Sequence, residues 1–193
     1  QHGVLFHTDA VQWFAKEPFE DIHQFNADLV SICAHKIHGP KGAGALFIQS
    51  PLQPAPISIG GSHENERRAG TENLAGIIGF VEALERFVRT PVFAREMLAP
   101  LTGRLLQLIA RLPGVQFVGS RERRLANTVA FVVSGSDSIP LLAGLDLEGI
   151  CASSGSACSA GSLEPSHVIE ALGGEGRLAN SLIRFSLGRE STL

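Results

Sequence analysis

The sequence predicts an α/β fold in two domains, and three observations carry this prediction. A strand-like run over 28–34 ends at His35-Lys36, and a glycine-rich turn over 39–42 leads into a second apolar run. Two segments between 74 and 112 place apolar residues at helical spacing. Beyond 115, short β-rich runs alternate with helical segments, as in an α+β layer. We expect the domains to be 1–92 and 93–193.

Composition excludes several classes of protein. The 193 residues are 44% hydrophobic and 18% charged, which is typical of a globular chain. A formal net charge of -3 offers no electrostatic reason to bind nucleic acid. No apolar run has the length of a membrane span, and no secretory signal is recognisable. Three cysteines cannot all pair in one chain and lack zinc-finger spacing, so we expect a reducing, cytoplasmic location and no resident metal.

The first domain begins with three predicted strands. The apolar run Val4-Leu5-Phe6 should deliver Asp9 at its carboxyl end, and strands 28–34 and 43–48 flank the glycine-rich turn. Because ligands of open α/β sheets bind beyond the carboxyl ends of strands, Asp9 and Lys36 should share one edge.

These two residues suggest a cofactor. A lysine held at a strand end is a candidate for Schiff-base chemistry, although a lysine in a turn more often points to water. A nearby aspartate is what pyridoxal phosphate requires, because the carboxylate keeps the ring nitrogen protonated. Gln12, three residues after Asp9, is placed to hydrogen-bond the phenolic oxygen of the ring.

Two helices should follow, over about 74–88 and 93–112, the second kinked or interrupted at Pro100. We expect the first to begin at Gly70-Thr71, where free backbone amides and the Thr71 hydroxyl would make an anion site; the alternative is a solvated loop. Its apolar face should comprise Leu74, Ile77, Ile78, Val81, Leu84 and Val88.

In the second domain we expect strands over 115–118, 127–133, 150–152 and 181–187, and helices over 138–147 and 164–172. Asp137, Asp146 and Glu148 are interpreted as helix-end charges. Cys151 is interpreted as a buried structural residue among apolar neighbours.

The segment 153–162 contains one thiol, Cys158, among small residues. Such a composition cannot pack a core, so a purely structural cysteine is the weaker interpretation. A thiol on a mobile tether can visit a buried site and then leave to meet an acceptor.

Five motifs together resemble a known family. The chain resembles the cysteine desulfurases of the iron-sulfur-assembly and nitrogen-fixation type, class V aminotransferase-like enzymes of pyridoxal phosphate fold type I. The resemblance implies that 1–92 is the C-terminal part of a large, mostly parallel-sheet domain and that 93–193 is a small C-terminal domain. It also leads us to expect a partial chain that lacks an amino-terminal part. The motifs, in order, are HTDAVQ, CAHKIHGPKG, GGSHENERRAGTEN, SSGSACSAG and IRFSLGR.

The resemblance implies roles for individual residues. Lys36 would hold pyridoxal 5'-phosphate as a Schiff base and later act as general base, and Cys158 would become a persulfide. Arg184 would grip the substrate carboxylate, where the alternative is a surface ion pair. Thr71 would reach the cofactor phosphate of the partner subunit in a homodimer.

Two neighbours of Lys36 would complete the phosphate site. His35 would donate to the phosphate. Cys33 stands where the family commonly has a phosphate-binding serine, and a thiol is a weaker donor; the alternative for Cys33 is a small buried apolar residue.

The implied activity is PLP-dependent removal of sulfur from L-cysteine, giving L-alanine and a persulfide on Cys158 for an iron-sulfur scaffold or another sulfur acceptor. A transient iron-sulfur cluster at Cys158 is compatible with this chemistry. The rival interpretations are a selenocysteine lyase or an aminotransferase of the same fold, and a non-catalytic sulfur-relay scaffold.

Overall fold

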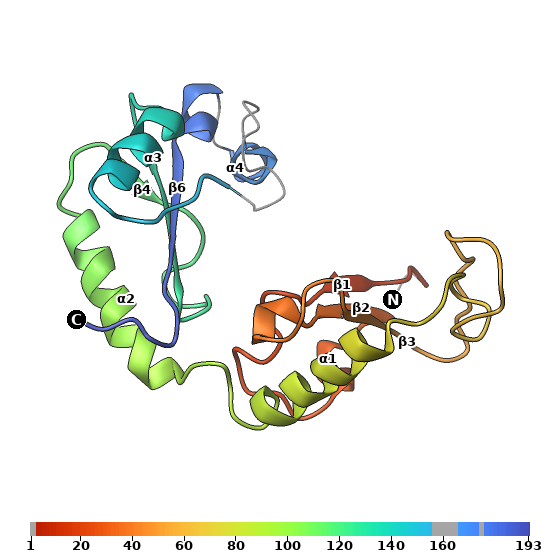
Figure 1. Ribbon diagram of the computed structural model, residues 1–193. Coiled ribbons are helices and arrows are strands. Elements are labelled where there is room, and N and C mark those ends of the chain that lie inside the picture. The colour runs from red at the N-terminus through yellow and green to blue at the C-terminus, as the bar shows by residue number, and fades with distance from the viewer. Residues whose placement is uncertain (1–2, 156–165, 174–175) are drawn as a thin grey trace. The chain divides into compact units, whose positions relative to one another are not determined.

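The computed structural model describes residues 3–155, 166–173 and 176–193 (Figure 1). Two compact units divide the chain, Gln1–Val92 and Phe93–Leu193, and each is described by itself. Within the described ranges, every helix is too short or too polar to cross a bilayer.

Unit 1 is built on a three-stranded sheet of β1 (His7–Asp9), β2 (Leu29–Cys33) and β3 (Gly44–Ile48), in the order β1-β2-β3. β1 runs parallel to β2, and β2 runs antiparallel to β3. The 3-10 helices η1 (Ile22–Phe25) and η2 (His35–Ile37) lie before and after β2. The predicted hairpin on either side of Lys36 is confirmed.

The first strand starts three residues later than predicted. Val4 and Leu5 are 80% and 59% exposed and lie outside any strand. Pairing begins at Phe6, whose carbonyl accepts the N–H groups of Asp28 and Leu29 at 2.9 and 3.2 Å. An apolar run becomes a strand only where a neighbouring strand lies beside it. Asp9 is therefore the last residue of β1 itself.

Helix α1 (Leu74–Phe87) forms as predicted but buries a different face. Gly76, Phe80 and Ala83 are buried, whereas Leu74 and Ile78 are 66% and 60% exposed. The small residues allow a close approach to the turn after η2. A Cβ atom added at Gly79 would lie 2.9 Å from the Pro40 ring, and one added at Gly39 would lie 3.2 Å from the Ala83 Cβ. The predicted apolar face of α1 is thus wrong for this unit.

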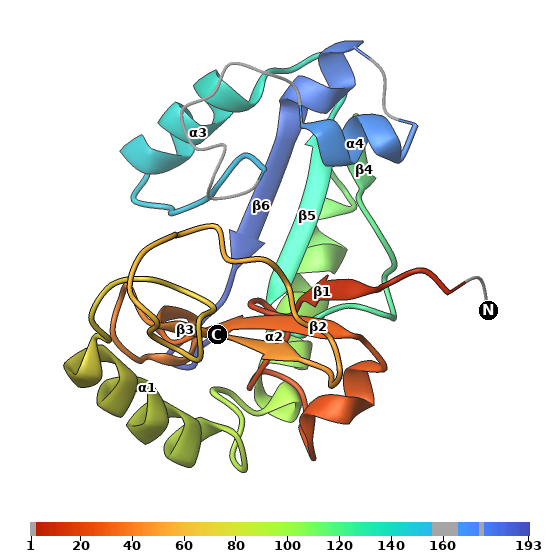
Figure 2. The same cartoon turned by 90° about the vertical axis from the view of Figure 1, so that its right-hand side faces the viewer.

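Unit 2 is an antiparallel sheet with helices on both faces (Figure 2). The strands are β4 (Val115–Phe117), β5 (Thr128–Val133) and β6 (Leu182–Ser186), in the order β4-β5-β6. The predicted strands are confirmed except 150–152, which forms no strand. The helical elements are α2 (Arg95–Ile109), α3 (Ser138–Leu147), α4 (His167–Ala171) and η4 (Gly176–Ser181).

The core of unit 2 has two layers, because successive residues of β5 face opposite sides of the sheet. One layer contains α2 and α3, and its buried residues are Ile109, Val129, Phe131 and Ile183. The other contains α4 and η4, and its buried residues are Val132, Ile169, Ala179 and Leu182.

Candidate functional site

Asp9 and Lys36 reach the same edge of the unit 1 sheet. Asp9 ends β1, and Lys36 lies in η2, three residues beyond the end of β2. The two strands run parallel, with Asp9 in register with Ser31. The carboxyl ends of both strands therefore point the same way, and both side chains belong to that edge.

The turn that holds Lys36 is anchored on buried residues. Ala34 and Ile37 are both 0% exposed. The N–H groups of Ile37 and Gly39 donate to the Ala34 carbonyl at 3.0 and 2.9 Å. Lys36 itself is half-buried, and no described residue forms a hydrogen bond or ion pair with its ammonium group. The backbone that carries Lys36 is thus fixed, and its Nζ is available for reaction.

The Asp9 carboxylate is held at one oxygen. Its Oδ1 accepts the N–H of Val11 at 3.0 Å. This contact orients the carboxylate at the turn that follows β1 and leaves Oδ2 for a further donor.

Gln12 follows in the same turn, and it has a partner that sequence reasoning missed. The Nζ of Lys16 donates to the Gln12 Oε1 at 2.6 Å, and Lys16 is only 7% exposed. The sequence could have indicated this contact, because side chains four residues apart meet in a helical turn.

Cys33 and His35 lie together beside Lys36. The Cys33 Sγ is 4.0 Å from the His35 Nε2. Cys33 is half-buried and His35 is exposed, so Cys33 is not the fully buried apolar residue that one alternative predicted. Both side chains are at least partly exposed to solvent.

The sequence predicts that α1 begins at Gly70-Thr71, but Thr71 lies before the first turn of the helix. The helix starts after Asn73, whose side-chain oxygen accepts the Gly76 N–H at 3.1 Å. A capping side chain thus satisfies an amide that an anion would otherwise meet. Thr71 lies two residues before the cap, on an exposed loop.

Arg184 occupies the middle of β6 in unit 2. Its Nε is buried, and no described residue offers it a hydrogen bond. A buried donor without an acceptor is costly, which is the state expected of a group that a ligand completes. The alternative role for Arg184, a surface ion pair, finds no partner among the described residues. Cys158, the predicted persulfide carrier, lies outside the described residues.

Cys151 is exposed, so its assignment as a buried structural cysteine is wrong. It belongs to the stretch after α3 that forms no strand, and its neighbour Ile150 is also 45% exposed. The segment meets the sheet just after Cys151, where Ala152 packs against the core and Ser153 forms a bridge to Arg184 of β6.

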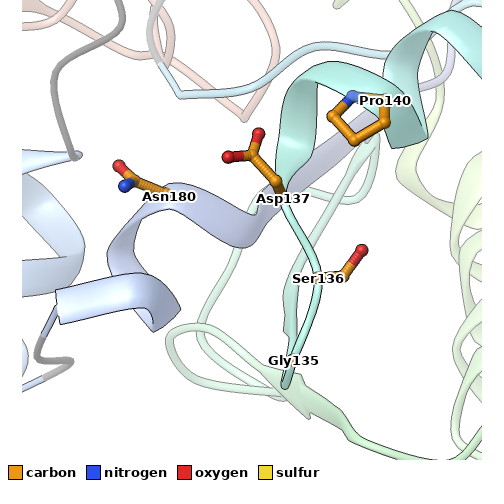
Figure 3. A pocket seen from close by; sticks show the side chains of 5 residues that line it. All are labelled: Gly135, Ser136, Asp137, Pro140 and Asn180. Carbon is orange, nitrogen blue, oxygen red and sulfur yellow. The ribbon is translucent and has the colours of Figure 1, made fainter.

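A shallow pocket of about 470 Å³ lies in unit 2, where the loop after β5 meets η4 (Figure 3). Asp137 lies at its rim and also caps α3, accepting the Ile139 N–H at 2.8 Å. Among the residues that the structure describes, none of the predicted site residues lines this pocket. The described lining residues are Gly135, Ser136, Asp137, Pro140 and Asn180.

No group of three or more histidine, cysteine or acidic side chains with the geometry of a metal site occurs in the part of the chain that the structure describes.

This chain is similar to known proteins in both sequence and fold. The cysteine desulfurase IscS of Dictyoglomus turgidum is 42% identical over all of this chain and 49% of its own length. IscS of Methanosarcina thermophila is 39% identical over all of this chain and 47% of its own length. The solved NifS-like protein from Rickettsia africae superposes with a TM-score of 0.85 at 34% identity, over 97% of this chain and 49% of that one.

The chain thus spans about half the length of the curated relatives it matches. Its fold is that of NifS-like pyridoxal phosphate enzymes of fold type I, which confirms the predicted fold class. The family model for aminotransferase class-V matches residues 1–193. This chain therefore belongs to the class-V aminotransferase family.

Proposed function

We propose that this protein is a pyridoxal phosphate-dependent cysteine desulfurase that takes sulfur from L-cysteine and releases L-alanine. The observation that carries the proposal is that Asp9 ends β1 and Lys36 follows β2, so that both belong to the carboxyl end of two adjacent parallel strands. The curated relatives named above are cysteine desulfurases, which supports the same conclusion.

The side chains at the sheet edge fit pyridoxal phosphate. The Lys36 amine is unengaged by any described residue and is suited to hold an aldehyde carbon. Asp9 has a second carboxylate oxygen for the pyridine nitrogen, and the exposed Gln12 carboxamide lies in the following turn. When bound, the cofactor supplies an electron sink for the carbanion that forms at the substrate α-carbon.

Each residue then has a task. Asp9 keeps a proton on the ring nitrogen, and Lys36 accepts the α-proton of the substrate at its Nζ. His35 and Cys33 are proposed to hold the phosphate from the segment next to Lys36. Thr71 is proposed to reach the phosphate of the partner subunit in a homodimer, and its exposed position on a loop supports this role.

Arg184 and Cys158 are proposed to handle the substrate. The guanidinium of Arg184 binds the cysteine carboxylate, and its buried Nε, which has no hydrogen-bond acceptor among the described residues, supports this assignment. Cys158 attacks as thiolate: a bond forms between its Sγ and the substrate sulfur, and the substrate C–S bond breaks. Its electron pair stays with the substrate carbon, which is protonated. The products are alanine and a persulfide on Cys158.

The persulfide is proposed to pass its outer sulfur to an iron-sulfur scaffold or another sulfur acceptor. A reducing compartment such as the cytoplasm keeps the Cys158 thiol available for this cycle, so we propose a cytoplasmic location.

The test uses the complete gene product, purified with pyridoxal phosphate. We expect alanine and, with a reductant, sulfide to be released from L-cysteine in equal amounts. Lys36→Ala should lose the visible absorbance of the bound cofactor and all turnover, whereas Lys41→Ala, an exposed lysine of the same turn, should lose neither. Cys158→Ala should bind cofactor normally and release no sulfide.

Other results would identify the rivals. Full activity of Cys158→Ala on an amino-acid substrate would indicate an aminotransferase. Faster turnover of selenocysteine than of cysteine would indicate a selenocysteine lyase. A wild-type protein without visible cofactor absorbance would indicate a non-catalytic sulfur-relay scaffold, an alternative that the Cys33 departure keeps open.

A further inference from the structure

We propose that Lys16 is a positioning residue that turns the Gln12 carboxamide so that its NH2 group faces the cofactor as a hydrogen-bond donor. The inference rests on the proposed function and adds to it a residue in the turn after β1. Neither the motifs nor the residue types had indicated a role for Lys16.

The first step is the contact itself. Lys16 Nζ donates to Gln12 Oε1 over 2.6 Å, and Lys16 is 7% exposed whereas Gln12 is exposed. An ammonium group has three donors and no acceptor, so only the amide oxygen can face it. The orientation of the amide is therefore decided by chemistry, and its nitrogen points away from Lys16.

The second step is the rigidity of the turn. The N–H groups of Trp13 and Phe14 both donate to the Ala10 carbonyl, at 3.0 and 2.8 Å. Ala10, Phe14 and Ala15 are 2%, 3% and 0% exposed. The backbone under Gln12 is thus fixed by buried neighbours.

The same turn is tied to the site. The Ala10 N–H donates to the Ser31 carbonyl at 3.0 Å, which joins the turn to β2, and Asp9 immediately precedes Ala10. The Val92 N–H donates to the Ala15 carbonyl at 2.9 Å and fixes the end of the turn that lies after Gln12. Gln12 is consequently held at a constant position relative to Asp9 and to the strand that leads to Lys36.

The third step is the chemistry of the ligand. The phenolic oxygen of pyridoxal phosphate carries negative charge and accepts hydrogen bonds, so an amide NH2 stabilises it and an amide oxygen repels it. A free carboxamide on an exposed turn would have to select one orientation when the cofactor arrives. With Lys16 in place the donor is already oriented before binding, which removes part of the cost of ordering the group.

The test compares Lys16→Met with Lys16→Arg in the cofactor-reconstituted gene product. We measure the cofactor dissociation constant by visible absorbance, and the pH midpoint of the absorbance change of the bound cofactor. Lys16→Met should weaken binding by about two- to tenfold, the range of one hydrogen bond. It should also raise the midpoint, because the donor stabilises the oxygen anion most in the high-pH form. Lys16→Arg retains a donor and should restore both values.

Three further variants make the result specific. Lys41→Met removes an exposed lysine and should change neither value. In a Gln12→Ala background, Lys16→Met should have no additional effect. Gln12→Glu keeps the contact to Lys16 but presents an oxygen to the cofactor, so it should bind cofactor more weakly than Gln12→Ala does.

Two outcomes would overturn the proposal: an equal effect of Lys16→Met with and without Gln12, or normal cofactor binding by Gln12→Glu. The second comparison leaves Lys16 intact, so it tests whether Gln12 presents a donor to the cofactor even if Lys16→Met does not fold. A wild-type protein that shows no cofactor absorbance would refute the proposed function itself. If instead the wild type binds cofactor and the variants bind it equally well, only the proposal for Lys16 is refuted.

Discussion

Ser153 and Arg184 are joined by two backbone hydrogen bonds: the Ser153 N–H donates to the Arg184 carbonyl at 3.0 Å, and the reverse bond measures 2.7 Å. This isolated bridge fixes the chain five residues before Cys158 to the strand that carries the proposed substrate-binding arginine. Because the bridge uses only backbone atoms, the Arg184 side chain can be changed without breaking it.

Replacing Arg184 should therefore affect substrate binding more than folding. Arg184→Lys keeps the charge but loses the planar, bidentate hydrogen bonding to a carboxylate. The KM for L-cysteine should therefore rise by about tenfold or more. Steady-state rates of alanine release measure this. Arg111→Lys, at an exposed position, is the control and should leave KM unchanged. An unaltered KM in Arg184→Lys would exclude the residue from the substrate site.

Asp9→Asn should abolish most of the activity without unfolding the protein. The asparagine oxygen can still accept the Val11 N–H, so the turn after β1 is retained. The neutral amide no longer holds a proton on the ring nitrogen, and kcat should fall by about a hundredfold or more. Activity and the thermal unfolding midpoint are measured together. If kcat stayed within a factor of two at an unchanged midpoint, Asp9 would not be the partner of the ring.

Asn73→Ala should weaken the start of α1. The side-chain oxygen that caps the Gly76 N–H is lost, which costs about 1 kcal/mol of unfolding free energy. Asn73→Asp preserves the cap and serves as the matched variant. Denaturant unfolding followed by circular dichroism compares the two, and equal losses in both variants would mean that the cap contributes nothing.

Gly79→Ala and Gly103→Ala should have opposite effects, although both add a methyl group inside a helix. At Gly79 the new Cβ would lie 2.9 Å from the Pro40 ring, and we expect a loss of about 1–3 kcal/mol. At Gly103 nothing lies within 4 Å, so the better helix propensity of alanine should stabilise by about 0.5–1 kcal/mol.

The unfolding free energies of the two alanine variants show whether packing against Pro40 or helix propensity dominates the effect of the added methyl group. Stabilisation by Gly79→Ala would show that α1 does not rest on the turn at Pro40.

Features that depend on local sequence were predictable. Helix α3 occupies the predicted 138–147, because its cap Asp137 and its apolar composition act within the segment. The hairpin of β2 and β3 follows from two apolar runs separated by glycines, and that local signal also places Lys36 beyond a strand end. Asp9 and Lys36 could be assigned to one edge because adjacent parallel strands end on the same side.

Features that depend on distant neighbours were decided by the tertiary structure alone. The start of β1 is set by Asp28 and Leu29, and the turn 39–40 lies so close to α1 that small residues, Gly79 and Ala83, face it. Cys151 is exposed because the segment after α3 pairs with β6 at Ser153 and not at Cys151. The sequence by itself determined which side chains could perform the chemistry, since periodicity and residue type act locally. Only the folded chain decided which of them are buried and what they contact, because those properties belong to pairs of residues far apart in the sequence.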